Sequence, residues 1–204
     1  MDARYRPAED SVNSPLRSAS VGEMPVGPKL RAKPLDHPFE IALVEPEIPP
    51  NTGAIARTAA ATASRLHLIG KLGFRIDEQS VRRAGLDYWP LVDLATHKSF
   101  EAFLEGRDTS RFHFLTAGVG QSIYEADFQP GDTLVFGKES VGLDAAILAR
   151  FEGQAVAIPT LGPVRSLNLA TAVSITVYEA LRQAGGLSKT FLASDAIGSG
   201  KVQT

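Results

Sequence analysis

Polar side chains that could bind a ligand or take part in catalysis gather in three stretches, each directly after a short apolar run. The stretches are EPEIPPNTGAIAR (45–57), FGKESVGL (136–143) and IPTLGPVRSLNL (158–169). Each combines glycine or proline with a few polar groups, and glycine lets the backbone approach a ligand closely. Taken singly, each stretch is an ordinary strand-to-helix turn. Together, at the carboxyl edge of one sheet, the three favour a binding site.

Arg57 is a long cation in the otherwise small and apolar run AIARTAAATA, just after a helix-starting turn made by Asn51 and Gly53. A guanidinium offers a planar fork of donors that fits a phosphate or a developing oxyanion, and its high pKa makes it a poor general base. From Gly53 to Arg83 six cations face only two carboxylates. This excess favours a phosphate-bearing partner, although a solvated basic face would have the same composition. We therefore expect Arg57 to point toward the loops and not into the core.

The composition indicates one globular domain. Of the 204 residues, 44% are hydrophobic and 22% charged, and the net charge is −2, so a nucleic-acid site would have to be a local patch. There is no cysteine and the four histidines lack metal-ligand spacing, so we expect no disulfide and no metal. No apolar run approaches the ~20 residues that span a bilayer, and no secretory signal begins the chain. We expect a cytoplasmic protein.

Short apolar runs alternate with helical stretches through the middle of the chain. The runs 39–44, 65–70, 89–95, 111–118, 132–137 and 154–159 predict strands, and 77–85, 99–106, 143–151 and 166–183 predict helices, with another helix starting at Gly53. The N-cap region of the helix at 143–151 is expected near Gly142 and Asp144, and Ser166 could cap the helix at 166–183. Such alternation is typical of an α/β fold, and strands this apolar indicate a mostly parallel sheet covered on both faces.

The two ends of the chain have a different composition. Residues 1–38 hold six of the thirteen prolines and few large apolar side chains, which predicts a disordered N-terminal extension. Residues 39–185 form the expected domain and 186–204 a flexible tail. The closing helix is apolar almost all round and needs burial on more than one side, so we expect a subunit interface along it.

Several common sites are absent from the sequence. There is no G-x-x-x-x-G-K-[ST] phosphate loop, no G-x-G-x-x-G after the first strand and no G-x-S-x-G elbow. A flavodoxin-like nucleotide binder would explain the α/β pattern but not the three polar loops.

The motifs LVEPEIPPNTGAIAR, RLHLIGKLGF, RRAGLDYW, LVFGKESVGL and IPTLGPVRSLNLATAVSITVYEALRQ resemble the SPOUT superfamily of RNA methyltransferases. Within it they are most similar to the small tRNA (cytidine/uridine) 2′-O-methyltransferases that modify the wobble nucleotide. The resemblance covers residues 39–185. It implies S-adenosylmethionine as methyl donor, a tRNA substrate, a parallel-sheet SPOUT fold with a C-terminal trefoil knot, and a homodimer with active sites at the interface.

The resemblance also implies roles for single residues. The catalytic set would be Asn51, Arg57, Glu139 and Asn168. The methyl donor would be bound by Leu115, Gly137, Ile158, Ser166 and Leu167. RNA or interface contacts would come from Arg82, Arg83, Arg165 and Tyr178. The chain departs from the family pattern at Val141, Asp144, Pro163 and Val164. An rRNA substrate, another tRNA position and a catalytically inactive RNA-binding module remain open as alternatives.

Overall fold

The structure is a computed structural model that describes residues 29–73, 91–118 and 120–193. The chain divides into two compact units. The larger unit, Arg31–Phe191, contains the sheet, the helices and the candidate site. The smaller unit consists of Met1–Leu30 and Leu192–Thr204. Its described residues are the first ones of strand β1 (Lys29–Ala32) and the last ones of strand β9 (Thr190–Ala193). These two strands pair as a small separate sheet.

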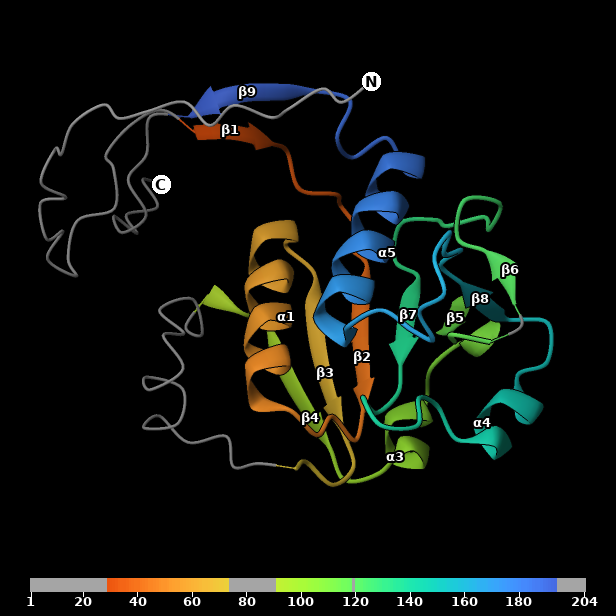
Figure 1. The fold of residues 1–204 in the computed structure, drawn as a ribbon. Coiled ribbons are helices and arrows are strands. Elements are labelled where there is room, and N and C mark those ends of the chain that lie inside the picture. Colours follow the sequence, from red (N-terminus) through yellow and green to blue (C-terminus); the bar gives the residue numbers. More distant parts are fainter. Residues whose placement is uncertain (1–28, 74–90, 119, 194–204) are drawn as a thin grey trace, which may run out of the picture. The chain divides into compact units, whose positions relative to one another are not determined.

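The larger unit is built on a seven-stranded sheet in which every pairing is parallel (Figure 1). In spatial order the strands are β4 (Leu94–His97), β3 (Arg65–Ile69), β2 (Glu40–Val44), β7 (Thr133–Phe136), β5 (Phe112–Leu115), β8 (Ala155–Ala157) and β6 (Gln121–Ser122). The α/β class and the parallel sheet predicted from the alternating pattern are therefore confirmed. The two-residue strand β6 was not predicted, because a strand that short leaves no periodicity to read.

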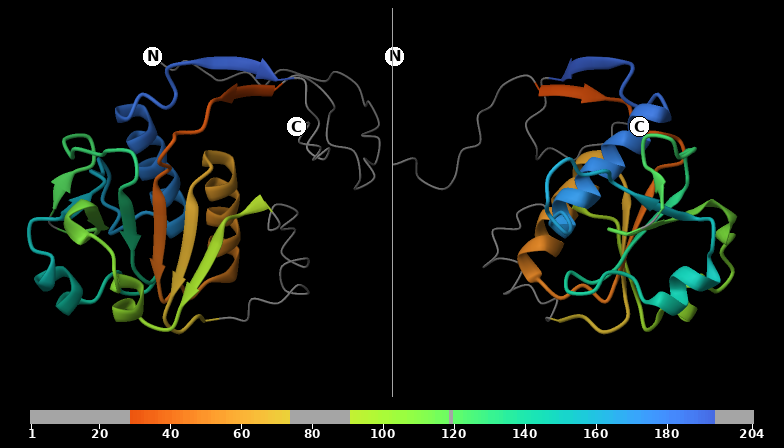
Figure 2. Two further views of the ribbon diagram at one scale, coloured as in Figure 1. Left: turned by 180° about the vertical axis from the view of Figure 1, so that it is seen from behind. Right: turned by 45° about the vertical axis from the view of Figure 1, so that its right-hand side comes forward.

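Helices cover both faces of this sheet. The long helices α1 (Pro49–Thr62) and α5 (Leu169–Gln183) lie side by side on one face, and the short helices α3 (Phe100–Leu104) and α4 (Ala145–Arg150) lie on the other (Figures 1 and 2). A 3-10 turn, η2 (Thr109–Arg111), leads into β5. Within the described residues no helix has the length and apolar character needed to cross a membrane.

Two hydrophobic cores follow from the alternation of side chains along each strand. In β2, Ile41 and Leu43 pack toward α1 and α5, whereas Ala42 and Val44 pack toward α3 and α4. All four are buried. The second core is rich in phenylalanine, and Phe151 after α4 stacks on a ring of β5 with the centroids 4.5 Å apart. Burial on both faces explains why the strands are continuously apolar.

The start of each helix has a local cause. The helix predicted from Gly53 begins four residues earlier, at Pro49, because proline is well tolerated in the first helical turn, where its missing N–H costs nothing. Ser99 caps α3 by accepting from Ala102 N. Asp144 caps α4, as predicted.

His67, His97 and His113 have structural partners in the larger unit. Buried His67 donates from Nε2 to Glu40 Oε2 at 3.0 Å, and its Nδ1 is hydrogen-bonded to His97 Nε2, also at 3.0 Å. Arg107 donates to the same Glu40 oxygen at 2.6 Å. The bond from His67, assisted by Arg107, lowers the pKa of Glu40 to about 2 despite its partial burial. His113 donates to buried Asp132 at 2.8 Å.

Both terminal segments contain described strands. Strands β1 and β9 fall inside the segments 1–38 and 186–204 that were predicted to be disordered or flexible. Leu35, also in the first segment, packs against the larger core. The helix expected at 77–85 lies outside the described residues.

Candidate active site

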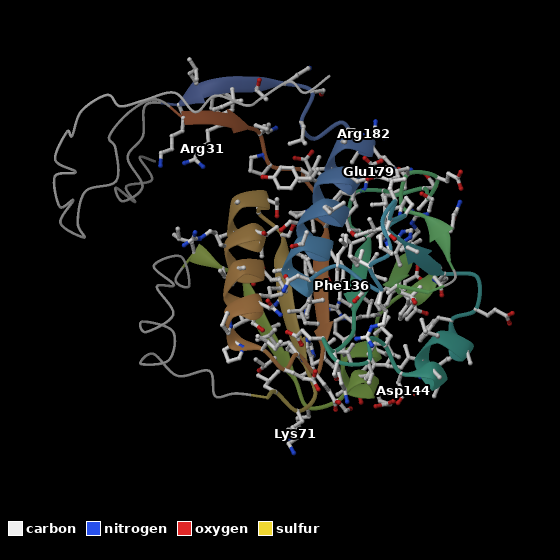
Figure 3. The ribbon with its side chains drawn as sticks, viewed as in Figure 1. Arg31, Lys71, Phe136, Asp144, Glu179 and Arg182 are labelled. Carbon is white, nitrogen blue, oxygen red and sulfur yellow. The ribbon has the colours of Figure 1, made fainter. Side chains whose placement is uncertain are left out.

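A cavity of about 710 Å³ opens at the carboxyl ends of β5, β7 and β8. Its walls come from residues 115–118 after β5, 136–143 after β7 and 158–169 after β8, with Asn51 from the first turn of α1. The last residue of β7, Phe136, is buried beside α5, and Asp144 stands at the start of α4 (Figure 3). A volume of this size suits a small organic ligand. The predicted site residues that line the cavity are Asn51, Leu115, Gly137, Glu139, Ile158, Arg165, Ser166, Leu167 and Asn168.

The loop after β7 is a tight turn closed by its own backbone. Lys138 N donates to Gly142 O at 3.1 Å, and Gly142 N donates to Lys138 O at 2.9 Å. Gly142 adopts φ +75°, which favours glycine. At Gly137 a Cβ atom would lie 2.1 Å from the backbone carbon of Gly142. The backbone contact excludes a side chain at Gly137, and the positive φ disfavours one at Gly142. The turn presents Glu139, Ser140 and Val141 to the cavity.

A chain of hydrogen bonds joins this turn to the two long helices. Glu139 accepts from Glu47 N at 2.8 Å, from Ile48 N at 3.2 Å and from Asn51 Nδ2 at 3.0 Å. Asn51 Oδ1 in turn accepts from Asn168 Nδ2 at 2.9 Å. Three of the four residues assigned to catalysis therefore meet: Glu139, Asn51 and Asn168.

Glu139 occupies the position of a helix cap. The N-cap residue of α1, Ile48, makes no side-chain cap bond, and the first turn of the helix holds no acidic residue. The orphan N–H groups at a helix start attract an anion. Glu139 supplies that anion from a loop about ninety residues away in sequence. One carboxylate thus caps α1 and fixes the side-chain amide of Asn51.

The cap of α5 differs from the prediction. We expected Ser166 to cap a helix covering 166–183, but α5 begins at Leu169 and Asn168 is its N-cap. Asn168 Oδ1 accepts from Ala170 N at 2.9 Å and from Thr171 N at 3.3 Å. The prediction was wrong because Asn caps at least as well as Ser, and local sequence does not choose between two candidates two residues apart. Ser166 stays in the exposed loop that lines the cavity.

Comparison with known proteins identifies the family. The model of the SpoU rRNA Methylase family matches residues 38–178.

The chain belongs to that family.

One relative, the tRNA (cytidine(34)-2′-O)-methyltransferase of Burkholderia pseudomallei (strain 1106a), is 47% identical over 151 residues, which are 72% of this chain and 96% of that protein. A solved structure described as "Structural insights into the 2-OH methylation of C/U34 on tRNA" is 51% identical, covers 72% of this chain and 96% of its own, and superposes with a TM-score of 0.67. The SpoU methyltransferase AviRb of Streptomyces viridochromogenes, solved with its cofactor AdoMet, is 26% identical with a TM-score of 0.60, over 74% of this chain and 62% of its own.

The remaining predicted residues of this SpoU-family chain lie away from the cavity or outside the described ranges. Arg57 is exposed on α1 and does not line the cavity. It therefore points away from the core, as expected, but not into the cavity of its own chain. Tyr178 is 47% exposed on α5 and also does not line it. Arg82 and Arg83 lie in residues that the structure does not describe.

Sequence reasoning missed a second group of contacts behind the turn. Glu47 accepts from both the backbone N and the Oγ of Ser140, at 3.0 Å each. Glu45 pairs with Lys138 at 2.5 Å. Local sequence held no signal for these contacts, because the partners lie about ninety residues later in the chain. Within the described ranges no three His, Asp or Glu side chains are arranged to hold a metal ion.

Proposed function

We propose that this chain transfers a methyl group from S-adenosylmethionine to the 2′-hydroxyl of the wobble nucleotide, position 34, of a tRNA. Relatives at 47% and 51% identity carry that activity in their names. The observation that carries the proposal is the cavity after β5, β7 and β8, where the Glu139–Asn51–Asn168 chain joins the loops that the family uses.

The cavity fits the methyl donor in size and chemistry. Its volume of about 710 Å³ lies in the usual range for cofactor pockets. Leu115, Ile158 and Leu167 offer apolar contacts, and at Gly137 the bare backbone forms the wall. Ser166 adds a hydroxyl beside them. When bound, S-adenosylmethionine supplies an electrophilic methyl group on a sulfonium, so the protein has mainly to position the ribose oxygen and stabilise charge.

Arg57 would stabilise the developing alkoxide or hold the adjacent phosphate. An arginine guanidinium is a poor general base, which argues against Arg57 as the proton acceptor. Because Arg57 does not line the cavity of its own chain, it would act at an active site completed by a second subunit. Asn51, Glu139 and Asn168 would fix the loops around the donor and the ribose.

The homodimer is part of the proposal. Ile175 of α5 is half-buried and Tyr178 exposed, so the apolar helix leaves surface for a partner. On the neighbouring helix α1 the exposed residues Ala54 and Ala61 flank Arg57, and such small side chains allow close helix packing. Sedimentation equilibrium at micromolar concentration should give twice the 21.8 kDa chain mass; a stable monomer would contradict this part.

The proposal includes a trefoil knot in the C-terminal third and a cytoplasmic location. The chain places β6 at the sheet edge, returns to insert β7 between β2 and β5, and then inserts β8 between β5 and β6. This order of entry supports a threaded C-terminal third. A cytoplasmic location follows from a tRNA substrate.

The test is methyl transfer to defined RNAs. Purified protein with labelled S-adenosylmethionine should modify tRNA, and mass mapping of nuclease fragments should place the 2′-O-methyl group on nucleotide 34. A tRNA with a 2′-deoxy nucleotide at that position is the matched control and should accept no label. Label in rRNA or at another tRNA position would overturn the substrate assignment, and donor binding without transfer to any RNA would indicate an inactive RNA-binding module.

A further inference from the structure

We propose that Glu47 is a positioning residue that holds the 137–142 turn in its donor-binding shape by clasping Ser140. Glu47 lies outside the cavity lining, whereas Ser140 lies within it. The inference rests on the proposed function only in taking the cavity as the donor site.

The clasp acts at the tip of the turn. The paired backbone bonds between Lys138 and Gly142 close the base. Ser140 is exposed at the tip, beside Val141, which is 76% exposed. The two oxygens of Glu47 each take one donor of Ser140, the backbone N–H and the hydroxyl, at 3.0 Å. Two bonds to one planar carboxylate fix both the position and the rotation of the tip.

Glu47 is itself held on a rigid support. Its flanking segment reads Pro46-Glu47-Ile48-Pro49-Pro50, and each proline fixes a φ angle. Pro46 is buried and its carbonyl accepts from Gly73 N at 3.0 Å. The backbone N–H of Glu47 donates to Glu139 at 2.8 Å. Because the backbone that carries Glu47 is already fixed, little conformational entropy is lost when its side chain binds Ser140.

The contacts between the two segments are reciprocal. Glu139, in the turn, accepts from the backbone of Glu47, and Glu47 accepts from the backbone of Ser140. The segments follow the neighbouring parallel strands β2 and β7. Hydrogen bonds to these two carboxylates therefore connect the segments beyond the point where the backbone pairing of β2 and β7 ends. Glu139 secures the start of α1, while Glu47 secures the cavity wall.

Two substitutions separate geometry from charge. S-adenosylmethionine carries a net positive charge, so removing any nearby carboxylate could weaken its binding electrostatically. Glu47→Gln removes the charge but keeps the shape: its carbonyl can accept from Ser140 N and its amide can donate to Ser140 Oγ. Glu47→Ala removes both. We expect Glu47→Ala to weaken donor binding about tenfold, the cost of ordering a loop on binding, and Glu47→Gln to stay within roughly threefold of wild type.

The experiment measures donor affinity by calorimetry on the full-length protein, together with hydrogen exchange of the peptide covering residues 137–143. Glu152→Ala, which removes an exposed carboxylate after α4, is the matched control and should leave both readouts unchanged. In Glu47→Ala, exchange of the turn should rise, KM for the donor should rise about tenfold, and KM for tRNA should not change. If Glu47→Ala does not fold, Glu47→Asp carries the same test, because its carboxylate is withdrawn by about 1.5 Å.

Each outcome decides the proposal. Wild-type affinity and exchange in Glu47→Ala would overturn it. Equal losses in the Gln and Ala variants would assign the effect to charge and would also overturn it. Wild-type protein that binds the donor but methylates no tRNA would refute the proposed substrate, while the affinity and exchange readouts still judge Glu47. Wild-type protein that does not bind the donor would refute the proposed function, and exchange at 137–143 would then decide whether Glu47 orders the turn.

Discussion

Replacing Glu139 by glutamine tests whether one carboxylate holds the start of α1 in place. The two carboxylate oxygens of Glu139 accept three hydrogen bonds: Oε2 accepts from Glu47 N at 2.8 Å, and Oε1 accepts from Ile48 N and Asn51 Nδ2. All three partners are donors, so the site has no place for an N–H group. A glutamine that keeps its carbonyl at the Oε1 position turns its amide toward Glu47 N, and that backbone donor loses its acceptor.

The expected magnitude follows from these contacts. One backbone donor left unpaired at a partly buried position costs about 1–2 kcal/mol, and the bonds to Ile48 and Asn51 weaken when the acceptor loses its charge. Loss of the anion at a helix start adds about 0.5 kcal/mol. The sum is about 2–3 kcal/mol, which for a domain of this length lowers the melting temperature by about 4–10 °C.

Differential scanning calorimetry of Glu139→Gln and of Glu152→Gln checks the reasoning. Glu152 is an exposed carboxylate away from the cavity, and its replacement should change stability by less than about 0.5 kcal/mol. Donor affinity should fall in the first variant only, because the turn loses its bond to Glu47 N and holds Asn51 more weakly. If the two variants melt at the same temperature and bind the donor equally well, the assignment of Glu139 as the cap of α1 is refuted.

Three further predictions concern the turn, the exposed arginine and the polar network. In Gly137→Ala the new Cβ would meet the Gly142 backbone at 2.1 Å, so the turn must move and donor affinity measured by calorimetry should fall more than about tenfold. Arg57→Ala should lower the single-turnover methylation rate about a hundredfold, which corresponds to ~3 kcal/mol, and Arg57→Lys should also be slow. The melting temperature should change little, since Arg57 is exposed. Equal rates in wild type and the two variants would refute the role of Arg57. The pKa of Glu40 is lowered from 4.5 to about 2 in the folded protein, so its contribution, up to about 3 kcal/mol, is present above pH 4.5 and is lost as the pH falls toward 2. Urea unfolding at pH 6 and pH 3 should show this loss in wild type and a smaller one in Glu40→Gln.

The sheet was predictable because its strands are buried on both faces. In the run FEIALV every residue after Glu40 is apolar because both cores contact the strand, and a run this short favours a strand over a helix. The cap at Asp144 was predictable for a similar reason, since a short polar residue directly precedes a helical run. The strand order was not, because the insertion of β7 between β2 and β5 depends on contacts between segments far apart in sequence.

The site was predictable as a set of residues and not as a set of contacts. Glycine in FGKESVGL indicated a close backbone approach, and the structure gives the partner of Gly137 as the far side of its own turn. Nothing in the local sequence tells which helix start Glu139 would cap, since its donors lie about ninety residues earlier. Glu47 was missed for the same reason: its donors belong to a loop whose position only the β2–β7 pairing defines.

The contacts around Glu139 and Glu47 link donor binding to the position of α1. The turn that lines the cavity touches the segment before α1 through both carboxylates. Asn51 and Asn168 extend the link to α5, where Asn168 also caps the helix. Thr58 and Ser174, one to two turns further along the two helices, are bonded at 3.0 Å, so polar contacts between α1 and α5 continue beyond the cavity. A ligand that tightens the turn would therefore stabilise the helix that carries Arg57. Donor binding should then protect the amides of α1 as well as those of the turn, and Glu139→Gln should remove the protection of α1 while leaving that of residues 158–167.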